Sequence, residues 1–283
     1  MKTCIVCVAK NESKYLSEWT MYHLSLGFDN IIIGNNDKEQ IQGLDDRVIV
    51  IDYSGYKSVQ SKAYTEIFRG YKDRYDWVLF LDCDEFVILD SKYSGDIKNF
   101  LSDSIFSKAD IIRLHWKIFS GGKELDVYGE DYLVMDRFKE HYPMEEEKWG
   151  KSFIRTSSSD YKEGKFYGHG YFAEPSLVAV NSLGEPCLNK WATIGDIPVH
   201  QGAWINHYPT KTIGEYIRQK YFRGGANNNP RRYANLNYFF RYNEYSKELE
   251  DYGKSLIEKI REEKIKNMPP NIYLGYKLKP REL

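Results

Sequence analysis

Apolar runs and helical stripes alternate along the first third of the chain. Four runs of apolar, often β-branched residues are typical of strands that are covered on both faces. Between them, apolar residues recur at helical spacing in two segments, one that Asn11 or Ser13 caps and Gly27 ends, and one over 58–71. The predicted strands are 3–9, 31–33, 48–51 and 77–81. Strands that alternate with helices predict an α/β fold with a mostly parallel, Rossmann-like sheet between helices.

The pattern is less regular in the rest of the chain, where glycine-rich loops separate shorter elements. We expect an α/β domain over 1–224 and a helical C-terminal extension over 225–283, packed on the same domain or standing apart from it. The further elements predicted are strands at 111–116 and 176–180 and amphipathic helices at 212–221 and 246–266.

Two aspartates, Asp82 and Asp84, directly follow the apolar run at 77–81. Two carboxylates this close together at the end of a buried strand are costly unless a cation lies beside them. Oxygen ligands of this kind suit Mg²⁺ or Mn²⁺, which in turn hold a diphosphate. In parallel sheets ligands bind beyond the carboxyl ends of the strands, where these residues lie. The sequence therefore predicts a metal–diphosphate site here, and the alternative is an ordinary acidic turn.

The balance of charge argues against a strongly charged partner. The 283 residues include 40 Lys and Arg against 41 Asp and Glu, a formal net charge of −1. A protein this close to neutral has no general attraction to nucleic acid or to an anionic membrane. Aromatic residues make up 16% of the chain, and such rings stack on sugars, although core packing takes most of them.

The four cysteines indicate a reduced, cytoplasmic protein. Cys4 and Cys7 form a C-x-x-C, but their spacing within a strand places the two side chains on opposite faces, so we expect no zinc site. No run reaches the ~18 apolar residues that a membrane-spanning helix needs. The first residues of the chain have the pattern of a buried strand rather than that of a signal peptide.

The segment 211–241 mixes basic and aromatic residues. Such a mixture binds single-stranded nucleic acid, rests on an anionic bilayer at the inner face of a membrane, or packs in an ordinary core. The overall charge makes nucleic acid the weakest of the three, and the other two stay open.

A series of short motifs, in a specific order and spacing, covers most of residues 4–224. The chain resembles the GT-A glycosyltransferases, in particular the family-2-like and family-92-like enzymes with the pattern KNE…YLxEWxxYH, LDxDEF and NHYxxK. The motif residues are Lys10-Asn11-Glu12, Tyr15-Leu16, Glu18-Trp19, Tyr22-His23, Gly27-Phe28-Asp29, Asn35-Asn36-Asp37, Gln60, Ala63-Tyr64, Leu81-Asp82, Asp84-Glu85-Phe86, Trp116, Phe119, Lys151, Asn206-His207-Tyr208, Lys211, Glu215-Tyr216, Lys220 and Arg223-Gly224.

The resemblance implies a GT-A fold, a UDP-sugar donor, Mn²⁺ or Mg²⁺, and transfer of a hexose with inversion. It implies a metal site of Asp82, Asp84 and His207, in which Asp84 binds the metal directly, Asp82 holds the ribose or a metal-bound water, and His207 is a third ligand. The residues it places around the donor are Ala9, Lys10, Asn11, Glu12, Asn36, Asp37, Gln60, Lys62, Asp82, Cys83 and Lys211, with Lys220 and Arg223 as further cations near the diphosphate.

Inversion needs a carboxylate that accepts the proton of the acceptor hydroxyl. Asp131 is our first candidate and Glu130 the second, and the alternatives are Glu146 and His169. We expect galactose as the sugar and a glycan or lipid-linked saccharide as the acceptor, in the synthesis of a surface polysaccharide.

Two other functions are compatible with parts of the pattern. A non-catalytic nucleotide-sugar-binding module would share the fold. A haloacid-dehalogenase-type phosphatase would use Asp82 as nucleophile and Asp84 as acid, but that motif sits on a first strand and here it ends a late one.

Overall fold

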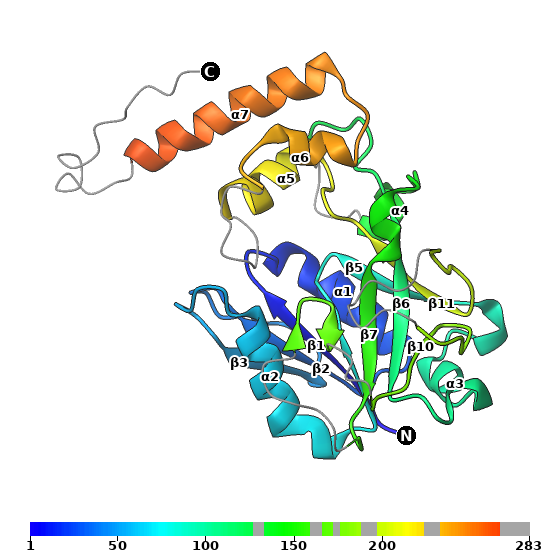
Figure 1. Ribbon diagram of the computed structural model, residues 1–283. Helices are drawn as coiled ribbons and strands as arrows, with labels where there is room; N and C mark the ends of the chain where they lie inside the picture. The colour runs from blue at the N-terminus through cyan, green and yellow to red at the C-terminus, as the bar shows by residue number, and fades with distance from the viewer. Residues whose placement is uncertain (127–132, 159–165, 172–175, 188–196, 224–232, 267–283) are drawn as a thin grey trace.

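The computed structural model describes residues 1–126, 133–158, 166–171, 176–187, 197–223 and 233–266 (Figure 1). Its main feature is a sheet of mixed direction in the order β3-β2-β1-β4-β7-β6-β11-β5, with β10 beside β6. The strands of this sheet are β1 (Thr3–Ala9), β2 (Asn30–Asn35), β3 (Val48–Asp52), β4 (Trp77–Phe80), β5 (Glu85–Leu89), β6 (Ile111–Ile118), β7 (Gly150–Arg155), β10 (Ala179–Asn181) and β11 (Ala203–His207). A separate hairpin pairs β8 (Phe166–Tyr167) with β9 (Gly170–Tyr171).

Helices cover the sheet, and several short ones join its strands. The α-helices are α1 (Ser13–Ser25), α2 (Gln60–Tyr71), α3 (Ile97–Leu101), α4 (Val134–Arg137), α5 (Ile213–Tyr216), α6 (Leu236–Arg241) and α7 (Lys247–Lys266), and α5 continues into a π-helix, η5 (Ile217–Tyr221). The 3₁₀ turns are η1 (Lys72–Arg74), η2 (Ser91–Tyr93), η3 (Ser104–Phe106) and η4 (Glu145–Lys148). The predicted α/β fold class, a mostly parallel sheet between helices with a helical C-terminal region, is confirmed.

The amino-terminal half of the sheet follows the sequence prediction closely. Strands β1 to β4 are parallel neighbours, with α1 packed on one face and α2 on the other. The C-x-x-C of β1 divides as predicted, because Cys4 belongs to the core cluster under α2 and Cys7 to the cluster under α1. Each face of β1 therefore contributes to a different apolar core.

Two local expectations for this half were wrong. β3 is not buried on both faces, because it is the edge strand of the sheet and leaves Val50 40% exposed. Neither Asn11 nor Ser13 caps α1, since Glu12 takes the N-cap position without a side-chain hydrogen bond. Asn11 instead adopts a left-handed φ of 57°, and its amide donates to the Arg218 carbonyl at 3.2 Å.

β5 is the other edge strand, and side chains of α1 complete its hydrogen bonding. β5 pairs with β11 alone among the described strands. On its free edge, the Trp19 indole donates to the Glu85 carbonyl at 2.7 Å and the Tyr22 hydroxyl donates to the Val87 carbonyl at 2.7 Å. The Val87 N–H donates to His23 Nε2 at 3.2 Å. Trp19, Tyr22 and His23 of the E-W-x-x-Y-H motif thus make the hydrogen bonds to β5 that a neighbouring strand would otherwise make.

The C-terminal helices form a third apolar core of their own. Ile213, Tyr216 and Ile217 pack with Phe239 of α6 and with α7, which lies beyond α5 and α6 at the top of Figure 1. Several aromatic residues of 211–241 are therefore core residues, as the packing interpretation expected. The boundary at residue 224 stays a prediction, because α5 and η5 precede it and share this core with α6 and α7. The described helices include none long and apolar enough to cross a membrane.

Candidate functional site

Asp82 and Asp84 lie in the turn between β4 and β5, at the carboxyl edge of the parallel strands. β4 pairs with β1 in parallel, and the Leu81 N–H extends this pairing to the Val6 carbonyl at 3.1 Å. The end of β1 and the two aspartates therefore meet at the same edge, where ligands bind in sheets of this kind.

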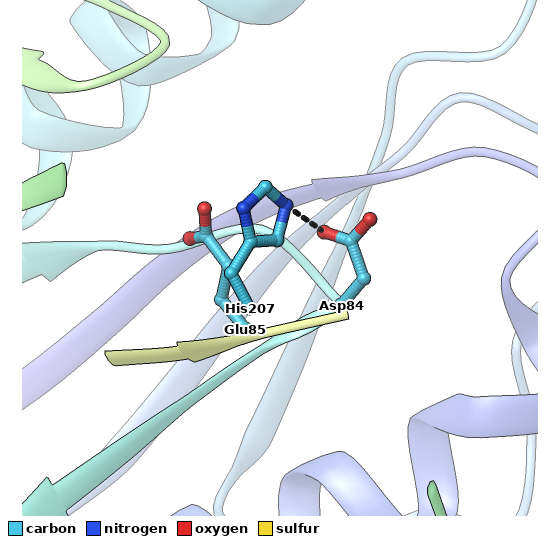
Figure 2. Close-up of side chains that lie close together, drawn as sticks. All are labelled: Asp84, Glu85 and His207. Carbon is cyan, nitrogen blue, oxygen red and sulfur yellow. Dashed lines mark ion pairs between the residues drawn. The ribbon is translucent and has the colours of Figure 1, made fainter. Parts of the chain in front are cut away.

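Asp84, Glu85 and His207 form a buried cluster at this edge (Figure 2). His207 ends β11 and is the cross-strand partner of Glu85, which begins β5. One ligand atom from each of the three residues lies within 4.8 Å of the other two. His207 Nε2 lies 3.7 Å from Asp84 Oδ1. Pairing of β5 with β11 thus brings together residues more than a hundred positions apart, as the predicted metal site requires.

Burial sets the protonation of this cluster. Burial alone would raise the pKa of Asp84, but the Lys220 ammonium lowers it well below its ordinary value. Burial lowers the pKa of His207 to about 3, so its imidazole is neutral near pH 7, the form that binds metals. Burial raises the pKa of Glu85 well above its ordinary value, against the attraction of Lys151.

The donor set fits a divalent cation. His207 Nδ1 and Glu85 Oε1 are buried and have no hydrogen-bond partner in the described part of the chain. Buried polar atoms without partners are rare, and a cation is one of the ions that satisfy them. Carboxylate oxygens suit Mg²⁺ and Mn²⁺, and an imidazole nitrogen favours Mn²⁺ of the two.

Asp82 lies outside this cluster and has a different set of contacts. Its side chain is 35% exposed, and its Oδ2 accepts a hydrogen bond from Lys151 Nζ at 2.6 Å. Its Oδ1 accepts from Gln60 Nε2 at 3.0 Å, at the start of α2. Gln60 was a predicted donor-site residue. Lys151 belonged to the resembling motifs without an assigned role, and its isolated position on a short strand gave no further signal.

The predicted nucleoside residues come together at the ends of β1 and β2. The Asn36 N–H donates to the Ala9 carbonyl at 2.9 Å, and the Asn11 N–H donates to Asp37 Oδ2 at 2.5 Å. The Asn36 amide is buried and donates to the Tyr53 carbonyl at 2.7 Å. These contacts join the two loops that the resemblance placed around the nucleoside.

Glu12 and Lys10 contact Arg223, in the C-terminal part of the chain. Glu12 Oε1 forms an ion pair with Arg223 Nη1 at 2.6 Å, and the same nitrogen donates to the Lys10 carbonyl at 2.5 Å. Gln219 Nε2 reaches the Asn11 carbonyl at 3.4 Å. The end of β1 is thus in contact with Gln219 of η5 and with Arg223, two residues after it.

Three further predicted donor-site residues, Lys211, Cys83 and Lys62, contact aromatic rings or the apolar core. Lys211 is 2% exposed, has a left-handed φ of 57°, and holds its ammonium 4.4 Å from the centre of the Tyr15 ring. Cys83 points into the core, with its Sγ 4.0 Å from that of Cys7. Lys62 lies 3.9 Å from the centre of the Tyr56 ring and 3.9 Å from Glu66.

The candidates for a catalytic base divide into two groups. Asp131 and Glu130 lie outside the described residues. Glu146 forms an ion pair with Arg241, and His169 Nδ1 lies 2.8 Å from the Gly150 carbonyl oxygen. The His169 ring is 5.2 Å from that of Trp116, which in turn lies 4.4 Å from His207.

A cavity of about 360 Å³ opens between the start of α1 and η5. Asn11, Tyr15 and Glu215 line one part of it, and Arg218 and Gln219 of η5 line another. Asp84 does not line this cavity. η5 therefore presents Arg218 and Gln219 to the cavity and Lys220 to the cluster of Asp84.

Comparisons with known proteins give no family for this chain. No family model matches it, and no curated protein does. The solved structures that resemble it include the bifunctional IspDF of Campylobacter jejuni, with 11% identity, a TM-score of 0.32, and coverage of 55% of this chain and 41% of that one. The mannose-1-phosphate geranyltransferase of Thermus thermophilus has 12% identity, a TM-score of 0.29, and coverage of 56% and 51%. The Francisella tularensis 2-C-methyl-D-erythritol 4-phosphate cytidylyltransferase has 10% identity, a TM-score of 0.26, and coverage of 55% and 73%.

These likenesses are distant. The chain spans about two fifths and one half of the first two structures, respectively. Scores and identities this low carry no argument about activity, so the function must be argued from the residues of the site.

Proposed function

We propose that this protein is a metal-dependent, inverting glycosyltransferase that moves a hexose from a UDP-sugar to a saccharide acceptor. One observation carries the proposal: Asp84, Glu85 and His207 converge at the carboxyl edge of the sheet, beside the loops at the ends of β1 and β2. The proposed cation site and the proposed nucleoside site are thus neighbours, an arrangement that supports a nucleotide-sugar donor.

The roles of the residues follow from their contacts. Asp84, His207 and Glu85 would hold Mn²⁺ or Mg²⁺, which neutralises the charge of a leaving nucleoside diphosphate when bound. Asp82, oriented by Gln60 and Lys151, would accept hydrogen bonds from the ribose or orient a water. The loops that carry Ala9, Lys10, Asn11, Glu12, Asn36 and Asp37 would border the nucleoside.

Cations of the chain would add to the neutralisation of the diphosphate. Lys211 is buried and its positive charge helps to lower the pKa of Asp84, and Lys220 contacts the Asp84 carboxylate directly. In a site of low dielectric such charges stabilise a developing anion more strongly than they would in water. Arg223, which contacts the Glu12 side chain, is the third cation at this edge.

Asp131, with Glu130 as the second candidate, remains the proposed base that takes the proton of the acceptor hydroxyl. Galactose stays the proposed sugar, and a glycan or lipid-linked saccharide the proposed acceptor, in the synthesis of a surface polysaccharide. Peripheral contact with the inner face of a membrane through 211–241 belongs to the same proposal.

The experiment is to incubate the protein with UDP-galactose, UDP-glucose and the UDP-N-acetylhexosamines in turn, with Mn²⁺ and a panel of saccharide acceptors, and to measure release of UDP together with formation of the glycoside. We expect release from one of these donors, lost in Asp84→Asn, and a product whose anomeric configuration, read by NMR, is inverted. If no donor releases UDP while thermal denaturation shows a folded protein, but UDP-sugars still bind, the non-catalytic binding module becomes the better account.

A further inference from the structure

Lys220 reaches the carboxylate of Asp84 from η5. Its Nζ lies 2.7 Å from Asp84 Oδ2 and donates a second hydrogen bond to the Pro209 carbonyl at 2.5 Å. The side chains of Lys220 and Asp84 are 12% and 8% exposed. The ammonium therefore occupies one oxygen of the carboxylate that the proposed function assigns to the metal.

η5 has an unusual geometry that favours such a role. It is a π-helix of five residues that directly continues α5. π-helical turns are rare and occur frequently at functional sites. A capping box between Thr212 and Glu215 fixes the start of this unit, and Arg137 forms an ion pair with Glu215 at 2.8 Å. η5 thus extends from a firmly anchored turn.

Three carboxylates at this edge are each paired with a different cation from the chain. Asp82 is paired with Lys151 at 2.6 Å, Asp84 with Lys220 at 2.7 Å, and Glu12 with Arg223 at 2.6 Å. Lys151 comes from β7, in the sheet itself, whereas Lys220 and Arg223 come from η5 and from the residues just after it. A cation site whose negative charge is already balanced attracts a further cation weakly.

We infer that Lys220 is a resident counter-ion of Asp84, which competes with the divalent cation and keeps it out of the site in the absence of a nucleotide. The inference rests on the proposed function for the identity of the cation site. A nucleoside diphosphate offers Lys220 an alternative anionic partner, so binding of the nucleotide and of the cation becomes cooperative. Lys220 thus pairs with Asp84 when the nucleotide is absent and with the diphosphate when the nucleotide is bound.

The test is to titrate Mn²⁺ alone into the wild type, Lys220→Met, Lys220→Arg and the control Arg218→Met, with the free Mn²⁺ followed by EPR. Arg218 lies on the same η5 but pairs with Asp126. We expect Lys220→Met to bind Mn²⁺ about tenfold tighter than the wild type, a coupling within the usual range. Lys220→Arg and Arg218→Met should bind it as weakly as the wild type.

The same titration at saturating UDP measures the cooperativity. We expect UDP to tighten Mn²⁺ binding to the wild type by about tenfold or more, and by less in Lys220→Met. If Lys220→Met does not fold, as thermal denaturation would show, Lys220→Gln replaces it in both titrations, because UDP binds Mn²⁺ through its own phosphates and the wild type alone would not test Lys220.

Equal Mn²⁺ affinity of the folded Lys220→Met variant and the wild type overturns the inference, as does the absence of any effect of UDP on a wild type that binds both. An equal gain in Arg218→Met overturns it too, because general charge would then explain the effect. If no variant binds UDP, the proposed nucleotide function fails, while the comparison of Mn²⁺ alone still decides whether Lys220 competes with the cation.

Discussion

Asp82 and Asp84 are separated by one residue, yet different parts of the chain hold them. Asp82 is 35% exposed and is bound by Lys151 of β7 and Gln60 of α2, both part of the sheet and its covering helices. Asp84 is buried, lies 3.7 Å from Nε2 of His207 of β11, and is paired with Lys220 of η5. The first aspartate is bound by residues of the sheet and of a covering helix, whereas the second is paired with a cation from η5, which we infer a bound diphosphate displaces.

This difference assigns separate tasks to the two carboxylates. The partners of Asp82 orient it, so it suits a hydrogen bond to a fixed group such as a ribose. The partners of Asp84 include a histidine with an unpartnered nitrogen and a competing ammonium, so it suits a cation that comes and goes. The predictions below test the two environments separately.

Lys151→Met should have the largest effect on stability. Lys151 is 1% exposed between Asp82, which is 35% exposed, and the fully buried Glu85, and its loss removes the cation that both groups share. Removal of one partner of a fully buried ion pair costs about 3–5 kcal/mol, and the exposure of Asp82 places the expected loss at about 3 kcal/mol. Denaturant unfolding measures this loss, and Lys98→Met, which removes a half-exposed pair with Asp29, is the control at about 1 kcal/mol or less. Equal losses in the two variants would contradict the assignment of Lys151 as a fixed element of the site.

His23 should make the strand that follows Asp84 sensitive to acid. Burial lowers the pKa of His23 to about 3 from an ordinary value of 6.5. Because the unfolded state binds the proton more readily, this contribution to stability is complete above pH 6.5 and is lost as the pH falls toward 3. The slope is about 1.4 kcal/mol per pH unit within that range.

Denaturant unfolding of the wild type and His23→Gln at pH 7.5, 6 and 5 measures this slope. We expect the wild type to lose more stability than the variant between pH 6 and pH 5. Equal losses of stability in the two proteins would mean that neutral His23 does not stabilise β5.

Removal of a single tyrosine hydroxyl, in Tyr22→Phe or Tyr64→Phe, should have the smallest effects. Tyr22→Phe removes the hydrogen bond from the Tyr22 hydroxyl to the Val87 carbonyl of β5 and leaves the ring in place. The expected loss is about 1 kcal/mol in denaturant unfolding. Tyr64→Phe, on the Asp82 side, removes a contact of 3.4 Å to that carboxylate and should cost less. A larger loss of stability in Tyr64→Phe than in Tyr22→Phe would contradict the expectation that the hydrogen bond of Tyr22 to β5 stabilises the fold more than the contact of Tyr64 with Asp82.

The sequence predicted the half of the fold whose signals are local. β1, β2 and β4 are continuous apolar runs, and α1 and α2 have regular stripes, so each could be read without its neighbours. β7 was missed, because its buried Lys151 resembles an exposed residue until its carboxylate partners are known. β5 and β11 were missed for a related reason: each contains charged or polar site residues that interrupt the apolar pattern.

The candidate site was predictable only in part. The position of Asp84 after a buried strand was a local signal, and the role of His207 came from the resemblance alone. The contact of Lys220 with Asp84 joins residues 136 positions apart and depends on the packing of η5, which no periodicity reveals. Glu85 was quoted within a motif but not proposed as a ligand, because its direction depends on the pairing of β5 with β11.

The most direct test of the central claim is calorimetric titration of UDP, with and without Mn²⁺, into the wild type, Asp84→Asn and Asp82→Asn. If the two aspartates have the tasks proposed here, Mn²⁺ strengthens UDP binding to the wild type. Mn²⁺ also strengthens UDP binding to Asp82→Asn, although that variant binds UDP more weakly than the wild type. Mn²⁺ has no effect on UDP binding to Asp84→Asn. Binding of UDP to Asp84→Asn that still depends on Mn²⁺ would contradict the account, because the cation would then bind elsewhere.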